Sequence, residues 1–256
     1  MTAPSGELEH GELVLHGRIM PASNATFLGQ IGEDRVVYKP IAGERPLWDF
    51  PVGTLADREV AAYLVSEALG WAVVPPTWLR DGPHGSGMVQ LWREPDAHQE
   101  AVTLVEEGCV PPGWRHVFDG VDSRDVPVAL VHEDSEPLRR MAVFDVVINN
   151  ADRKGGHVLA MADGHRYGVD HGVTFHVEHK LRTVLWGWVG EPVPEADLED
   201  VHRVGKALAG SLGDDLSVHL TDPEIDATVR RCRRLSERAV MPAPRGSYPA
   251  IPWPPF

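Results

Sequence analysis

The chain has 256 residues and a formal net charge of -14 at pH 7. That length suits one large domain or two small lobes that share a cleft, and a hydrophobic fraction of 43% is enough for a packed core. The excess of negative charge argues against nucleic acid and anionic membrane surfaces as partners, because both carry dense negative charge themselves.

Cysteine usage and hydropathy narrow the class of protein further. Only Cys109 and Cys232 occur, so a disulfide framework is excluded and a thiolate zinc site is disfavoured. Residues 1–20 lack the charged and apolar regions of a signal peptide, and no apolar run approaches the roughly 20 residues that span a bilayer. We therefore expect a cytoplasmic protein without a transmembrane segment.

The first third of the chain is predicted to be rich in β-strands. A helix, capped by Thr54 or Asp57 and ended by Gly70, interrupts them. Alternating or continuous apolar runs predict the strands, which we place at 12–20, 25–31, 35–40, 72–79 and 87–92.

The rest of the chain is predicted to be mainly helical, with a β-hairpin formed by 156–161 and 167–172. The pattern is weak from 93 to 133, where 126–132 is a candidate strand. Apolar periodicity and capping residues predict the helices, which we place at 135–150, at 194–210 and from a Thr221/Glu224 capping box to about residue 240.

The Pro-rich segment 242–256 cannot be helical, because proline lacks a backbone N–H and clashes with the preceding turn. It carries Ile251, Trp253 and Phe256, and a large apolar side chain costs roughly 1.5–3 kcal/mol when it stays in water. We therefore expect the segment to dock on the chain itself or on a partner.

The stretch 149–172 carries the chemistry. Asp152 follows a predicted helix, Lys154 and His157 lie two and five residues later, and a hairpin returns the chain to Asp170. Phosphoryl transfer needs a carboxylate for the attacking hydroxyl, a cation beside the transferred group and ligands for a divalent metal ion. Asp152 and Lys154 suit the first two needs, while His157 and Asp170 suit the third. Protein kinases have the same order and spacing around their catalytic loop.

A second group of candidates lies upstream. Lys39 ends the third predicted strand, where a kinase lysine binds the ATP phosphates, and Glu59 on the next helix can orient it through an ion pair. Residues at the end of the fifth predicted strand fall where an adenine-binding hinge belongs, namely Gln90, Leu91 and Trp92.

These residues resemble the phosphatidylinositol 3- and 4-kinase-like family, most closely its type II phosphatidylinositol 4-kinases and more distantly the HipA-type kinases. The similarity covers roughly residues 14 to 210 and rests on the segments VVYKP (36–40), EVAAYLVSEALGWAVVPPT (59–77), FDVVINNADRKGGHVL (144–159), YGVDHGVTF (167–175) and HKLRTVLWGWVG (179–190).

The resemblance implies an α+β, two-lobed kinase-like fold with a β-rich N-lobe to residue 92, a mainly α C-lobe over 93–241 and a tail over 242–256. It implies ATP and Mg²⁺ or Mn²⁺ as cofactors. Lys39 would bind the ATP phosphates, Asp152 would be the catalytic base and Asp170 a metal ligand. A loop without the GxGxxG pattern would cover the phosphates through Ser23, Asn24 and Thr26.

Two departures from the family leave alternatives open. His157 stands where the family has Asn, and imidazole favours softer metals than Mg²⁺, so manganese, a single-metal mechanism or a weakened enzyme fits it. The chain also lacks the cysteine-rich lipid-modified stretch of the lipid kinases. We expect a kinase for a hydroxyl of a protein or small molecule. A nucleotide-binding pseudokinase and AMP transfer on the same fold are the alternatives.

Other polar clusters have structural explanations. Asp145 on the apolar side of its helix is expected to pin the following loop through backbone N–H groups. The arginines at 230–234 are expected to lie on a solvated helix face. Trp186 and Trp188 are expected to pack in the core or cleft, and a zinc site at the histidines 176 and 179 has no cysteine to support it.

Overall fold

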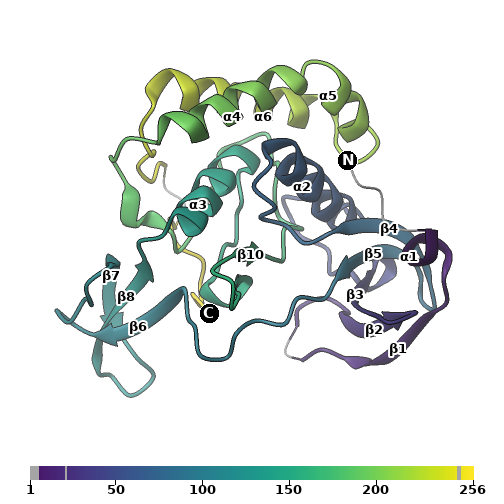
Figure 1. The fold of residues 1–256 in the computed structure, drawn as a ribbon, viewed down its shortest axis with the longest axis horizontal. Coiled ribbons are helices and arrows are strands. Elements are labelled where there is room, and N and C mark those ends of the chain that lie inside the picture. Colours follow the sequence, from purple (N-terminus) through teal and green to yellow (C-terminus); the bar gives the residue numbers. More distant parts are fainter. Residues whose placement is uncertain (1–5, 21, 247–248) are drawn as a thin grey trace.

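The computed structural model describes residues 6–20, 22–246 and 249–256. Among these residues, a five-stranded antiparallel sheet lies at one end, helices cover the middle, and a three-stranded sheet projects at the other end (Figure 1). The protein is therefore α+β, with antiparallel sheets first and a helical part after them.

The five-stranded sheet has the order β1-β2-β3-β5-β4. Its core contains Ile31, Val36 and Tyr38, all fully buried. The predicted strand at 72–79 begins late, because Pro75 and Pro76 cannot donate to a ladder. After the short helix α1 (Gly6–His10), which the sequence did not predict, the strands are β1 (Leu13–Arg18), β2 (Phe27–Ile31), β3 (Asp34–Pro40), β4 (Thr77–Gly82) and β5 (Gly85–Leu91).

Helix α2 (Leu55–Leu69) lies against this sheet and ends, as predicted, at Gly70, whose φ of 77° is left-handed. Its start differs from the prediction. Thr54 occupies the N-cap position but makes no side-chain capping bond, and the Glu44 carboxylate accepts hydrogen bonds from the N–H groups of Leu55 at 3.2 Å and Ala56 at 2.9 Å. A negative charge at this end also suits the helix dipole.

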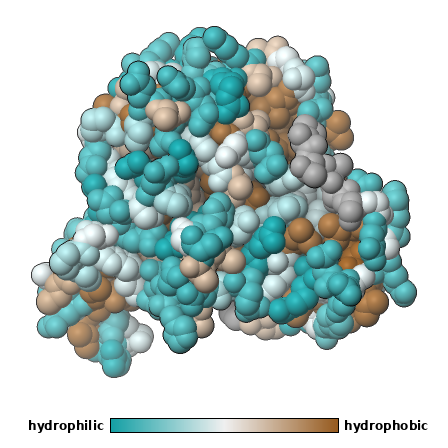
Figure 2. All heavy atoms as spheres, in the orientation of Figure 1, coloured by the Kyte–Doolittle hydropathy of each residue, from teal (hydrophilic) through white to brown (hydrophobic). Residues whose placement is uncertain are grey.

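The three-stranded sheet has the order β6-β8-β7, with strands β6 (Val102–Glu106), β7 (Trp114–Val121) and β8 (Pro127–Glu133). The sequence predicted only the last of them. β7 carries half-exposed residues on both faces and a bulge between His116 and Phe118, so it lacks the period-two pattern of a one-sided strand. Hydrophobic residues gather on the surface of this sheet, at the lower left of Figure 2.

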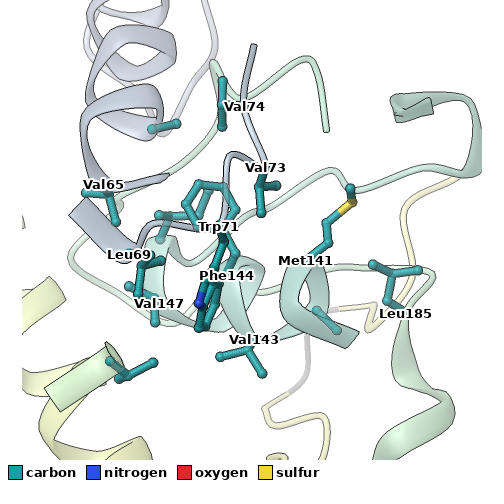
Figure 3. Packing of buried hydrophobic residues seen from close by; sticks show 14 of the residues in the cluster. Val65, Leu69, Trp71, Val73, Val74, Met141, Val143, Phe144, Val147 and Leu185 are labelled. Atoms are coloured by element: carbon teal, nitrogen blue, oxygen red, sulfur yellow. The ribbon is translucent and has the colours of Figure 1, made fainter. Parts of the chain in front are cut away.

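The helical part contains a main core. Its helices are α3 (Glu136–Ile148), α4 (Glu195–Ala207), α5 (Ser211–Leu216) and α6 (Asp222–Arg238), of which α5 was not predicted. Trp71 packs on the α3 residues Phe144 and Val147 (Figure 3). Between α3 and α4 lies the predicted hairpin, with strands β9 (Val158–Ala160) and β10 (Arg166–Gly168). Three 3-10 turns complete the elements at Ile41–Gly43, Gly155–His157 and Trp186–Trp188.

The predictions for polar side chains on the helices are confirmed only in part. Ser135 begins α3 by accepting from the N–H of Leu138 at 3.4 Å. At the start of α6 the Glu224 carboxylate accepts from the Thr221 N–H at 2.9 Å, as the capping box predicts. The expectation of a solvated arginine face is wrong for Arg231, which is half-buried and donates to the carbonyls of Val147 and His176.

None of the helices in the described ranges has the length and apolar character that a membrane crossing requires.

A buried histidine makes the stability depend on pH. His132 is fully buried against Trp188, and its Nδ1 lies 2.8 Å from the Glu133 carbonyl. Its Nε2 accepts from the Gly187 N–H at 3.0 Å, so this nitrogen must stay unprotonated. Burial lowers the pKa of His132 from 6.5 to about 4.

The unfolded chain binds this proton below about pH 6.5 and the folded chain only below about pH 4, so stability falls as pH drops through that window. We expect His132→Gln to remove about 2–3 kcal/mol of the decline in unfolding free energy between about pH 7 and about pH 4.5. Urea unfolding at the two pH values measures it. Identical declines in the wild type and the variant contradict this assignment.

Candidate functional site

Three charged side chains from separate elements meet beside the five-stranded sheet. The Lys39 ammonium, at the end of β3, donates to Glu59 Oε1 on α2 at 2.8 Å and to Asp170 Oδ1. Asp170 follows β10 and lies 131 residues from Lys39 in the sequence. The predicted ion pair between Lys39 and Glu59 is therefore confirmed, and Lys39 is close to Asp170.

Glu59 connects this triad to the backbone. Its side chain is buried, and its second oxygen accepts from the N–H of His171 at 2.8 Å. Asp170 itself has a left-handed φ of 63°, which few residues other than glycine adopt. One buried carboxylate thus fixes both the lysine and the turn that presents Asp170.

The charges of the triad reinforce one another. Burial opposes the charged form of Lys39, but the carboxylates of Asp170 and Glu59 outweigh it and raise the lysine pKa above its ordinary value. The Lys39 ammonium in turn holds the pKa of Asp170 well below its usual range, although the surrounding protein atoms partly desolvate the carboxylate. Both groups are therefore charged at neutral pH, and the half-exposed Asp170 carboxylate remains accessible from solvent.

The loop after α3 supplies a second carboxylate and a second lysine. The N–H of Asp152 donates to the Asn150 side chain at 3.0 Å, and the Lys154 ammonium lies 3.4 Å from Asp152 Oδ2. Burial raises the pKa of Asp152, while the charges of Lys154 and Arg182 oppose the rise. A carboxylate with a raised pKa is a stronger base, which suits proton abstraction from a hydroxyl.

His157 and Asp170 are the groups that could hold a divalent ion. His157 Nε2 lies 3.4 Å from Asp170 Oδ2, and burial lowers the pKa of His157 to about 4, so a nitrogen lone pair is free at neutral pH. Within the described ranges, no group of three His, Cys, Asp or Glu side chains is arranged to hold a metal. An ion here therefore needs further oxygens from phosphate or water, as Mg²⁺ sites in phosphoryl-transfer enzymes have. Among the described residues, His176 and His179 are likewise not part of a group of three side chains that could hold zinc.

A buried arginine that the sequence did not single out organises these loops. Arg153 is fully buried and donates to Asp145 at 2.9 Å, to the Val169 carbonyl at 3.1 Å and to His171 Nε2 at 2.6 Å. Asp145 was expected to bind backbone N–H groups of the loop. Its carboxylate instead accepts from side chains, namely those of Arg153, Asn150 and Thr183. The prediction was right about position but wrong about partners.

Most of the predicted site residues line one cleft of about 950 Å³. The loop between β3 and α2 forms part of the lining through Glu44, Arg45, Pro46 and Leu47, which no sequence pattern indicated. The Arg45 N–H donates to the Asn24 side chain at 2.9 Å, so this loop also fixes the segment around Asn24. Nine predicted site residues line the cleft: Ser23, Asn24, Thr26, Lys39, Glu59, Asp152, Lys154, His157 and Asp170.

The predicted hinge residues lie elsewhere. In the described part of the chain, the cleft lining does not include Gln90, Leu91 or Trp92. The Gln90 side chain donates to Thr77 at 2.8 Å inside the sheet. The N–H groups of Leu91 and Trp92 donate to the carbonyls of Pro76 and Arg35. Their role in adenine binding stays a prediction.

Comparison with known proteins gives one relative with high sequence identity. Protein Rv2133c of Mycobacterium tuberculosis is 50% identical to this chain over an alignment of 262 residues. The alignment covers 97% of this chain and 94% of that protein. No family model matches the chain. The crystal structure of the Helicobacter pylori proinflammatory kinase CtkA aligns with 93% of this chain and 96% of its own, at a TM-score of 0.48 and 12% identity.

Proposed function

The chain belongs to the same family as Protein Rv2133c, and from the geometry of its cleft we propose that it is an ATP-dependent phosphotransferase. One observation carries this proposal. Lys39, Glu59 and Asp170 form a connected triad, and the loop with Asp152 and Lys154 lines the same cleft. A phosphate-binding lysine, its orienting glutamate, a metal-binding aspartate and a base are the parts that kinases use.

Each part has a task in this mechanism. Lys39, held by Glu59, binds phosphate oxygens of ATP, and the loop around Asn24 covers them. Asp152 accepts the proton of the acceptor hydroxyl as its oxygen bonds to the γ-phosphorus. The bond from that phosphorus to the β–γ bridging oxygen breaks, and ADP leaves. Lys154 lies beside Asp152 and balances negative charge on the transferred group.

Asp170 and His157 would hold Mg²⁺ or Mn²⁺, which would neutralise charge on the phosphates. The imidazole makes Mn²⁺ the better fit, because nitrogen ligands favour softer ions than Mg²⁺. The acceptor is a hydroxyl of a protein or a small molecule. We further propose that the N-lobe over 1–92 and the C-lobe over 93–241 enclose this cleft, in the manner of the phosphatidylinositol 3- and 4-kinase-like family.

Two other functions fit particular observations. His157 in place of asparagine favours a nucleotide-binding pseudokinase, and an open cleft of about 950 Å³ leaves room for ATP in the orientation for AMP transfer. ATP labelled at either the α- or the γ-phosphate separates these from a kinase. We expect protein or inorganic phosphate to gain only the γ-label. Transfer of the α-label supports AMP transfer, and binding without any turnover supports the pseudokinase.

Lys39→Met should weaken nucleotide binding. The variant removes the cation that meets the phosphates and leaves the buried Glu59 without its lysine partner. A desolvated charge-assisted contact is worth about 1.5–3 kcal/mol, so we expect roughly a tenfold to hundredfold rise in the dissociation constant for ATP. Calorimetric titration with Mn²⁺ present measures it. Lys206→Met is a control, because Lys206 lies in the last turn of α4 outside the cleft lining of the described residues. Equal affinities of both variants contradict the assignment.

A further inference from the structure

Residues 249–256 lie across the loop that carries Asp152. In Figure 1 the C-terminus lies near β10. At one end of the segment, the Ala250 carbonyl accepts from the Thr183 N–H at 3.1 Å and from the Trp186 indole at 2.9 Å. At the other end, the Pro255 carbonyl accepts from the Gly155 N–H at 2.8 Å. Two sets of hydrogen bonds therefore attach the segment to the catalytic loop and its neighbour.

The ring of Phe256 rests directly on Gly155, three residues after Asp152. A Cβ at position 155 would lie 2.4 Å from the ring carbon Cε1, far inside van der Waals contact. Gly155 is not among the residues with positive φ, so a larger residue here would meet the Phe256 ring and would not strain the backbone. The absence of a side chain at Gly155 thus leaves space for the Phe256 ring.

Only part of the segment is buried, and the exposed part includes a ring in the cleft. Ile251 packs against the main core, whereas Trp253 is 76% and Phe256 46% exposed. The tail therefore contacts the chain itself, which is one of the two expected outcomes, while Trp253 stays exposed. Pro254 and Phe256 line the cleft together with Asp152 and Lys154. Ligand pockets are lined mainly by hydrophobic and aromatic side chains with a few polar groups, and Phe256 and Asp152 supply one of each.

The segment borders the cleft and does not fill it. The volume of about 950 Å³ is present with the segment in place. Residues 249–256 contain no serine, threonine or tyrosine, so the segment itself has no hydroxyl to accept a phosphoryl group. Met20 and Leu47, two further exposed apolar side chains, also line the cleft. Part of the cleft lining is thus apolar.

We propose that residues 249–256 complete the acceptor side of the cleft, and that Phe256 contacts an acceptor with an apolar group beside its hydroxyl. This inference rests on the proposed phosphotransferase function. The hydroxyl oxygen of that acceptor bonds to the γ-phosphorus, the bond to ADP breaks, and the hydroxyl proton passes to Asp152. Phe256 takes no part in the bond changes and selects which hydroxyl reaches Asp152.

Two small alcohols at equal concentration test the selection. We expect the wild type to transfer phosphate from ATP to benzyl alcohol about tenfold faster than to glycerol, since one good apolar contact is worth about that factor. Phe256→Ala should lose most of this preference, and Phe256→Leu, which keeps apolar bulk, should retain much of it. Trp253→Ala is the matched control, because Trp253 is outside the cleft lining of the described residues. No transfer to either alcohol, or a preference that survives Phe256→Ala, overturns the inference.

A second measurement does not depend on catalysis. Hydrogen exchange of the Gly155 amide should be slow in the wild type, because Pro255 accepts its hydrogen bond, and faster in Phe256→Ala. Fast exchange in the wild type means that the segment does not dock, and it overturns the inference while leaving the proposed function intact. A protected Gly155 without any ATP binding or turnover refutes the proposed function, and the acceptor inference falls with it.

Discussion

Asp152→Asn is expected to lower the rate of ATP turnover by about 10²- to 10⁴-fold, the range that a positioned general base contributes. The amide keeps the size of the side chain but cannot accept the hydroxyl proton. The Asp152 N–H already donates to Asn150, and this backbone contact does not need the carboxylate. ATP affinity should therefore change little. Release of labelled phosphate under saturating ATP measures the turnover, and calorimetry measures the affinity.

Asp163→Asn is a matched control for this variant. Asp163 lies in the turn between β9 and β10, where its carboxylate accepts from the His165 N–H at 2.9 Å, and it is exposed. We expect its turnover to equal that of the wild type. In the wild type, turnover should also rise with pH across the Asp152 pKa, which lies above the ordinary 3.8 because the group is buried. Unchanged turnover in Asp152→Asn would mean that another group is the base.

Asp145→Ala is expected to destabilise the fold by about 3–5 kcal/mol, the cost of breaking a buried ion pair by removing one partner. Asp145 and Arg153 are both fully buried, so the arginine would keep its charge without a counterion. The loop with Asp152 depends on the same contacts, since Arg153 also binds the Val169 carbonyl and His171. Denaturant unfolding measures the change in free energy.

Two comparisons decide whether the buried charge is the cause. Glu237→Ala removes an exposed partner of Arg233, and we expect a change within about 0.5 kcal/mol. Adding Arg153→Met to Asp145→Ala removes the unpaired charge, so the double variant should lose less than the sum of the two single variants. A loss in Asp145→Ala no greater than in Glu237→Ala refutes the role of this ion pair.

The parts of the fold that sequence predicts best are those fixed by local patterns. The period-two runs before residue 40 became β1, β2 and β3, and the amphipathic stretch at 135–150 became α3. The pair Lys39 and Glu59 followed instead from the kinase-like order of the site residues, because the two are 20 positions apart in the sequence. In β1, β2, β3 and α3 the local pattern of apolar residues already determines the type of element.

Contacts between side chains of different elements explain what the sequence did not predict. Glu44 caps α2 from a loop without any capping motif, and Arg153 is buried where it pairs with Asp145 of α3, eight residues earlier. An arginine between Asp152 and Lys154 looks like a surface residue until its partners are known. β6 and β7 were missed because half-exposed strands show no clear alternation.

The contact between Lys39 and Asp170 in one nucleotide cleft is the central claim. A crystal structure with a non-hydrolysable ATP analogue and Mn²⁺, located by its anomalous scattering, tests it most directly. We expect Mn²⁺ bonded to the Asp170 carboxylate and to phosphate oxygens, with the Lys39 ammonium on the same phosphates and Asp152 facing the γ-phosphate. Nucleotide bound elsewhere, or no nucleotide bound at saturating concentration, would contradict the claim.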